Sequence, residues 1–301
     1  MKRILTVGAS LMLLLVPAHT AAASPTLPAG DAMFEVSCYY LANDHQLHSL
    51  NVRAGTRTPI GDGVGSDDTG SPCATQGAVK PGTDWLYYTD GHSHGLFRVN
   101  LVSGEVESIG EVLLDGSRVS LISLAIDDSG NAYGLTENLL YSVNLSTATL
   151  SDEKQADVFA STGGYPFGFA FDPITDEFYV VESVNRGLYR LGIDTGDLTL
   201  LATNTDVVVG SMAFDSSGRL WVNGDDFGVA SVTLGNFGNT GRWYDTGNLS
   251  PSVYSNSIAI RRPQTSGNEN LANTGAVEIA PLVIVTLGAA VLAFTLRRRS
   301  S

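Results

Sequence analysis

The feature that most constrains the fold of this chain is a short phrase that recurs five times. Each copy centres on an alanine with mostly large apolar neighbours, and the residue two positions before the alanine is small or polar. This alternation has the period of two that indicates a β-strand. The alanines are Ala78, Ala125, Ala170, Ala213 and Ala259, so successive copies lie 47, 45, 43 and 46 residues apart. A period in the forties is typical of the blades of a β-propeller.

Three more strand-like segments follow the phrase in a regular order. An aromatic segment comes second and is preceded by turn residues such as Asp127–Gly130. The second segments are residues 85–88, 132–135, 178–181 and 220–223, and the third are 96–99, 140–143, 188–191 and 229–232. Residues 106–109 and 198–201 are examples of the fourth. Four antiparallel strands per repeat predict a propeller blade.

The two ends of the repeat region complete each other. Residues 34–40, 47–52 and 58–61 look like second, third and fourth strands without an alanine phrase before them, whereas the phrase around Ala259 has no second strand after it. Joining them makes a fifth blade whose innermost strand, Ser257–Ile260, comes from the C-terminal side. The sequence thus predicts an all-β, five-bladed propeller over residues 33–260. An irregular extra blade from residues 235–255 would make it six.

The C-terminal part of the chain has the features of a membrane segment. Ile279 to Leu296 is an uncharged run of 18 residues, close to the length that crosses a bilayer core. The three arginines after it are expected to stay on the cytoplasmic side, which places the preceding chain outside. We expect a transmembrane helix at 276–296 and a basic tail at 297–301. A buried core helix is the alternative, but no globular sequence follows for it to pack against.

The N-terminal part agrees with export. A basic start is followed by an apolar core from Ile4 to Val16 and by the small residues Ala21–Ala23, which predicts a signal peptide over residues 1–23. An uncleaved anchor is the alternative, although this apolar core is short for a membrane span. Residues 24–32 are expected to form a leader, and the polar residues 261–270 a linker.

A five-residue motif precedes the predicted membrane helix. Its residues are Leu271, Ala272, Asn273, Thr274 and Gly275. Motif, apolar helix and basic end together resemble the cell-wall sorting signal of Gram-positive surface proteins, in the form with alanine at the second position that is similar to signals of high-GC species. The resemblance covers only the tail. It implies that a sortase attacks the carbonyl of Thr274, releases Gly275 and transfers the chain to an amine of a peptidoglycan precursor. The expected location is the outer face of the cell wall, after a membrane-spanning precursor.

The charge of the exported part excludes one class of partner. The whole chain has a formal charge of −14, and removing the two terminal signals takes away five basic residues and one acidic residue, which leaves −18. So acidic a domain repels phosphates, and we therefore expect no nucleic-acid partner.

Cys38 and Cys73 both lie in the exported part. A disulfide between them is expected there, and it would stabilise the fold by roughly 3–4 kcal/mol on the chain-entropy estimate. Two separate buried thiols are the alternative.

Candidate binding residues lie in the predicted connections between second and third strands, which share one face of a propeller. Acids there would suit Ca²⁺, a sugar or a cationic partner, and the histidines would suit a transition metal. A solvated rim of turn residues is the plainer interpretation, and the loop from Asp62 to Asp68 is a further Ca²⁺ candidate without a helix-loop-helix spacing. The candidates are Asp44, His45, His48, Asp90, His92, His94, Glu137, Glu182 and Asp225.

The sequence favours a binding or interaction module over an enzyme. The acids next to the inner strands, Asp127, Asp172 and Asp215, lie in turn sequences rather than as the paired carboxylates of a glycosidase. The phrase Leu188–Gly196 loosely resembles propeller repeats of actinobacterial surface proteins, streptogramin lyases and sugar-lactone hydrolases, but it transfers no catalytic residue. We expect an envelope, carbohydrate or protein ligand and no obligatory cofactor. A secreted propeller lyase or hydrolase with a site at the rim is the alternative.

Overall fold

The computed structural model describes residues 26–36, 47–61, 74–90, 94–156, 164–184, 186–203, 209–224, 228–232, 245–246 and 257–263. All of them belong to the first of two compact units, residues 1–264 and 265–301. The predicted signal peptide, sorting motif and membrane helix lie outside these ranges. Within them, no helix has the length and apolar character needed to cross a membrane.

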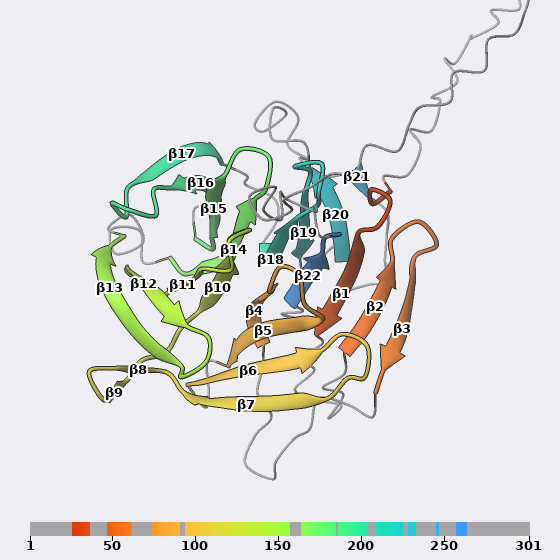
Figure 1. Cartoon of the computed structure of the whole chain (residues 1–301). Coiled ribbons are helices and arrows are strands. Elements are labelled where there is room, and N and C mark those ends of the chain that lie inside the picture. The colour runs from red at the N-terminus through yellow and green to blue at the C-terminus, as the bar shows by residue number, and fades with distance from the viewer. Residues whose placement is uncertain are drawn as a thin grey trace, which may run out of the picture. The chain divides into compact units, whose positions relative to one another are not determined.

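The described residues form five sheets arranged around one axis, each with four main strands in antiparallel order, as Figure 1 shows. We number the sheets as blades 1 to 5 in chain order. The innermost strands are β22 (Ser257–Arg261), β4 (Ala74–Val79), β10 (Ser123–Ile126), β14 (Pro166–Asp172) and β18 (Val209–Phe214). Each carries one alanine of the repeated phrase. The prediction of an all-β, five-bladed propeller is confirmed.

The outer strands follow in the predicted order within each blade. Second strands are β1 (Ala32–Val36), β5 (Trp85–Asp90), β11 (Ala132–Leu135), β15 (Glu177–Glu182) and β19 (Leu220–Gly224). Third strands are β2 (Leu47–Asn51), β6 (Gly95–Asn100), β12 (Leu139–Asn144), β16 (Gly187–Leu191) and β20 (Gly228–Val232). Fourth strands are β3 (Thr56–Ile60), β7 (Val106–Glu111), β13 (Thr149–Gln155), β17 (Leu198–Thr203) and β21 (Asp245–Thr246). Since β21 pairs with β20, the described part of residues 235–255 belongs to blade 5 and not to a sixth blade.

Blade 1 closes the ring as predicted. Strand β22 pairs antiparallel with β1, and Ala259 lies opposite Phe34. Arg261, the last residue of β22, forms an ion pair with Asp84 in the β4–β5 turn of blade 2. The C-terminal strand is therefore bonded to its own blade and held to the next one.

Blade 3 contains a hairpin that the sequence pattern did not predict. Strands β8 (Leu113–Leu114) and β9 (Ser117–Arg118) pair with each other, and β8 pairs in parallel with the edge strand β13. Asp115 and Gly116 between them both have positive φ, the backbone of a tight hairpin turn. Strands of two residues are too short to produce a recognisable alternation.

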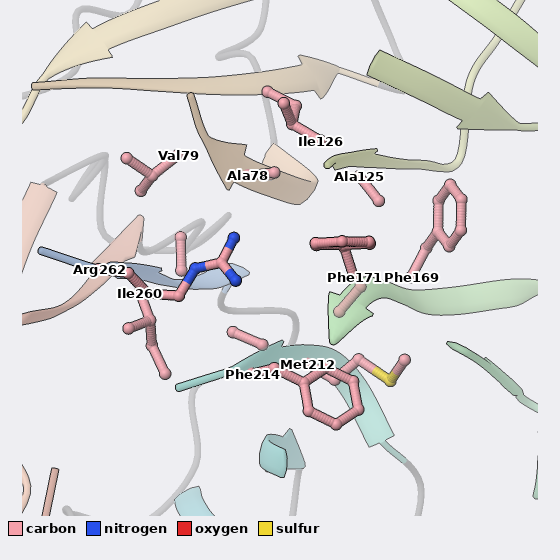
Figure 2. A pocket seen from close by; sticks show the side chains of 14 residues that line it. Ala78, Val79, Ala125, Ile126, Phe169, Phe171, Met212, Phe214, Ile260 and Arg262 are labelled. Atoms are coloured by element: carbon pink, nitrogen blue, oxygen red, sulfur yellow. The ribbon is translucent and has the colours of Figure 1, made fainter. Parts of the chain in front are cut away.

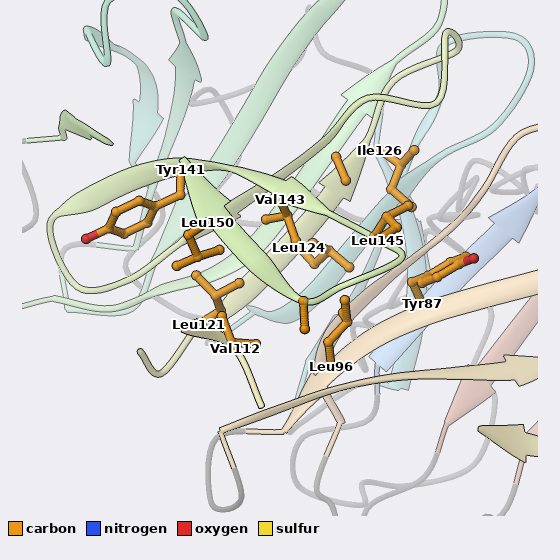
Figure 3. Close-up of a cluster of buried hydrophobic side chains, with 12 residues drawn as sticks. Tyr87, Leu96, Val112, Leu121, Leu124, Ile126, Tyr141, Val143, Leu145 and Leu150 are labelled. Carbon is orange, nitrogen blue, oxygen red and sulfur yellow. The ribbon is translucent and has the colours of Figure 1, made fainter. Parts of the chain in front are cut away.

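Apolar side chains fill the spaces between neighbouring blades. Figure 3 shows the cluster between blades 2 and 3, in which Tyr87 and Leu96 of blade 2 meet Leu124 and Ile126 of β10. Leu96 and Leu124 have no exposed surface. Full burial of such a side chain contributes about 1.5–3 kcal/mol, so these contacts hold the blades together.

Two turn glycines allow a blade to approach its neighbour closely. Gly104 has a φ of +75°, and a Cβ there would lie 2.6 Å from the carbonyl oxygen of Ile60. Gly196 has a φ of +79°, and its Cβ would collide with the carbonyl oxygen of Gln155. Each turn joins a third strand to a fourth and packs against the end of the preceding blade, so its glycine serves both the turn and the interface.

Candidate functional site

The five alanines of the repeated phrase line a hollow on the propeller axis. It has a volume of about 360 Å³ with its open mouth included. Figure 2 shows Ala78 and Ala125 with Phe171, Phe214 and other side chains around this space. The innermost strands converge here, so a small side chain at the alanine position is what leaves room for the hollow.

Hydrogen bonds join three of the innermost strands, β4, β18 and β22, near the positions that precede the alanines by two. The side-chain amide of Gln76 donates to the carbonyl of Met212 at 3.0 Å and accepts from the amide of Met212 at 3.2 Å. Ser257 Oγ accepts from the amide of Gly77 at 2.9 Å, and Ser211 Oγ accepts from Ile258 at 3.0 Å. The polar members of the repeat thus satisfy main-chain groups of other blades.

Arg262, one residue after β22, extends over the hollow. Its Nη2 pairs with Asp128 Oδ1 at 2.6 Å, and its Cζ lies 5.8 Å from the centroid of the Phe171 ring. Figure 2 shows the guanidinium pointing into the ring of side chains. Its Nη1 is buried and has no hydrogen-bond acceptor among the described residues, an arrangement that costs about 1–3 kcal/mol unless another acceptor is supplied. This residue falls in the polar stretch 261–270 that was predicted to be a linker.

A larger cleft lies between blades 3 and 4. It has a volume of about 780 Å³, and its lining includes the aromatic residues Tyr133 of β11 and Phe178 of β15. Their ring centroids are 5.1 Å apart in an edge-to-face arrangement, with an angle of 77° between the planes. Tyr133 also lines a neighbouring hollow of about 640 Å³ toward Lys80 of blade 2. The cleft therefore offers an aromatic wall bounded by turns.

Carboxylates dominate the charge of this cleft. Glu177 pairs with Arg190 at 2.9 Å and accepts a hydrogen bond from the Tyr179 hydroxyl at 2.9 Å. Burial raises the pKa of Tyr133, and nearby carboxylates, first that of Asp127, raise it further. This pKa shift agrees with a negative potential in the cleft. The charged residues of the lining are Asp127, Asp176, Glu177, Asp194 and Arg190.

The predicted rim residues that the structure describes are distributed over four blades. His48 lies in blade 1, Asp90 and His94 in blade 2, Glu137 in blade 3 and Glu182 in blade 4. In the described ranges, no group of three or more His, Cys, Asp or Glu side chains lies close enough together to hold a metal ion. Asp44, His45, His92 and Asp225 fall outside those ranges, as do the loop Asp62–Asp68, both cysteines and the five sorting residues.

Several of the described rim residues are buried, so they do not form a uniformly solvated set of turn residues. Glu182 has no exposed surface, and one of its carboxylate oxygens accepts a hydrogen bond from the amide of Val184 at 2.6 Å. Asp90 is 1% exposed and His48 8%, whereas Glu137 is exposed. None of these residues lines the axial hollow or the cleft.

The strand directions explain this difference in position. Neighbouring strands of a blade are antiparallel, so the turns after first strands and the loops after second strands lie at opposite ends of the blade. Asp127, Asp194 and Arg262 belong to the end with the first-to-second turns. The ligand-binding residues predicted from the sequence belong to the other end, because acids and histidines gather in its loops.

The acids next to the inner strands mainly hold their own turns, as expected. Asp172 Oδ1 accepts from the amide of Ile174 at 2.9 Å, and Asp127 Oδ1 accepts from Asn131 at 2.8 Å. Asp215 accepts from the indole of Trp221 at 2.9 Å as well as from its own turn. These carboxylates are engaged in stabilising the blades.

Comparison with known proteins shows distant likeness in fold alone. No protein-family model and no curated protein matches the chain. A structure of a nidogen/laminin complex is 14% identical, with coverage of 68% of this chain and 75% of that one and a TM-score of 0.47. A catalytically inactive virginiamycin B lyase from Staphylococcus aureus with quinupristin is 13% identical, with 67% and 68% coverage and a TM-score of 0.41. The extracellular domain of a putative one component system from B. thetaiotaomicron is 17% identical, with a TM-score of 0.39. The match covers 67% of this chain and 25% of that one.

Proposed function

We propose that this chain is a binding module displayed on the outer face of a Gram-positive cell wall, and that it binds carbohydrate of the envelope in the cleft between blades 3 and 4. The observation that carries the proposal is the combination, in one cleft of about 780 Å³ with its open mouth included, of the partly exposed ring of Tyr133 with four carboxylates.

The chemistry of the cleft suits a ligand with hydroxyl or amino groups. Ionised carboxylates such as Asp194 accept hydrogen bonds from hydroxyls and pair with ammonium groups. The partly exposed ring of Tyr133, which packs edge-to-face on the buried ring of Phe178, supplies apolar surface for the carbon face of a sugar. An anionic polymer is disfavoured, because the lining carries four carboxylates and one arginine.

A pair of aspartates in one turn tests this site. Asp194 and Asp197 are both exposed, but only Asp194 lines the cleft. We expect Asp194→Asn to weaken binding of glucosamine oligomers about tenfold in calorimetry on the full-length chain, and Asp197→Asn to leave it unchanged. Equal affinities for the two variants would place the ligand elsewhere. Product analysis in the same experiments tests the alternative that the propeller cleaves the sugar.

The proposed location rests on the sorting motif and is tested separately. We expect Thr274→Ala to move the protein from the wall fraction to the membrane fraction of a high-GC Gram-positive host, because the carbonyl that the sortase attacks belongs to this residue. Asn273→Ala changes the unrestricted position of the motif and serves as the control. Wall attachment of the Thr274→Ala chain would refute sorting at this site.

The proposed anchor also limits the reach of the module. Only 14 residues separate Ile260 from Thr274, which span about 50 Å when fully extended. A domain held this closely suits a ligand in the wall itself better than a distant one.

A further inference from the structure

Arg262 brings a hydrogen-bond donor to the axial hollow that no described residue uses. Its side chain retains only 16% of its accessible surface, and Nη1 is buried without an acceptor from the described part of the chain. The other terminal nitrogen is engaged by Asp128. The guanidinium is therefore held in position by an ion pair while one of its nitrogens faces the hollow (Figure 2).

The charge around Arg262 favours an uncharged acceptor. Asp128 already pairs with the guanidinium, and Asp31 lies near enough for Arg262 to lower the pKa of its carboxyl against the larger effect of burial, which raises it. A carboxylate or phosphate would meet these two aspartates as well as the arginine. A carbonyl oxygen accepts from Nη1 without adding a third negative charge.

The shape of the hollow restricts what reaches Nη1. The alanines at the repeat positions supply five methyl groups, and Phe171 and Phe214 supply aromatic surface. The space that the centre of a water molecule can occupy is about 40 Å³, which admits a small group and excludes a whole sugar ring. A carbonyl with a short apolar end matches both features.

We propose that the axial hollow binds an acetamido group, with its carbonyl oxygen accepting from Arg262 Nη1 and its methyl group among the five alanines. Sugars and peptides both carry such a group, and the recognition chemistry is the same for either source. This site is distinct from the cleft between blades 3 and 4 and does not depend on the proposed function.

Saturation-transfer NMR on the full-length chain tests the contact directly. N-acetylglucosamine is the probe, and glucose is the control that lacks the acetyl group. We expect the acetyl methyl protons to receive the strongest saturation and glucose to bind at least tenfold more weakly. If N-acetylglucosamine binds but its acetyl methyl receives no more saturation than the ring protons, the proposal is overturned.

A matched pair of arginine variants tests the donor. Arg262→Met should weaken N-acetylglucosamine binding about tenfold or more, since it removes a hydrogen bond from a charged group. Arg261→Met changes the neighbouring residue and breaks its ion pair with Asp84. This variant should bind N-acetylglucosamine as the native chain does. Unchanged affinity in a folded Arg262→Met chain contradicts the proposal, and if that variant does not fold, the methyl saturation of the native chain decides.

The source of the group is distinguished by a second probe. N-acetylalanine methylamide carries the same acetyl group on a peptide unit. Binding of this probe in place of the sugar supports the acetamido site and assigns it to peptides. Failure of both probes to bind refutes the site.

Discussion

Gln76 and Met212 exchange two hydrogen bonds across the propeller axis, although 136 residues separate them in the sequence. Gln76 belongs to β4 of blade 2 and Met212 to β18 of blade 5, so the bonds join blades that are not neighbours in the ring. The glutamine amide acts as a short piece of main chain, donating to a carbonyl and accepting from an N–H. Its side chain is 1% exposed.

Replacing Gln76 should therefore destabilise the whole ring. We expect Gln76→Leu to lower the free energy of unfolding by about 2–4 kcal/mol, because it leaves the amide and carbonyl of Met212 buried without partners. Urea denaturation of the full-length chain measures this loss. Ser123→Ala is the control, since Ser123 holds the equivalent position of blade 3 and its Oγ has no partner among the described residues. A similar loss in both variants would argue against the special role of Gln76.

Removal of the closing strand should abolish the cooperative fold. A chain that ends at Ser250 lacks β22 and leaves both β1 and the interface with blade 2 unpaired. We expect its melting temperature to fall by more than roughly 10 °C, or its transition to broaden, in calorimetry. A chain that ends at Gln264 keeps β22 and should melt as the full-length chain does. If the chain that ends at Ser250 melts at the same temperature as the full-length chain, closure by β22 is unnecessary.

Two glycines with the same backbone test the close approach between blades 3 and 4. Gly196 and Gly116 both have a φ of +79°, but a Cβ on Gly196 would collide with Gln155 whereas a Cβ on Gly116 meets nothing within 4 Å. Gly116→Ala should cost about 1–2 kcal/mol for the left-handed conformation. Gly196→Ala should cost at least about 2 kcal/mol more, because a backbone carbonyl must move. Urea titrations of the two variants give the difference, and equal costs would show that the blades adjust freely.

Tyr141 should make the fold sensitive to alkali. Burial and the hydrogen bond to Glu153 raise the pKa of Tyr141 from 10.0 to about 12. The folded chain therefore keeps a proton that the unfolded chain loses, and stability falls as the pH rises from about 10 to about 12.

This pH dependence is tested by measuring the midpoint of urea denaturation at a series of pH values from 9 to 12. We expect Tyr141→Phe to lose less stability than the native chain across this window. Glu153→Gln should shift the ionisation of Tyr141 to lower pH, because the tyrosine hydroxyl no longer donates to a carboxylate. An identical pH slope in native and Tyr141→Phe chains would contradict the assignment.

Most of the candidate site was beyond prediction from the sequence. Asp127 and Asp194 are 67 residues apart and share a cleft only because blades 3 and 4 pack side by side. Arg262 follows the last strand in a polar stretch, and its one local signal was the pair of arginines Arg261 and Arg262 at the end of β22. The loop acids and histidines attracted attention by composition, yet those that the structure describes lie on four different blades.

The sequence by itself determined the strand order and the closure by Ser257–Ile260, and it limited the blade count to five or six. These properties follow from local alternation of side chains and from turn residues, which repeat within each blade and are visible in a short window. Only the tertiary structure decided that Gln76 reaches Met212, that Arg262 points into a ring of alanines and that the two hollows lie at the end with the first-to-second turns. Each of these three findings depends on how the five inner strands converge and on which side-chain rotamers their packing allows. The convergence of the strands and the choice of rotamers are not encoded in any one segment of the chain.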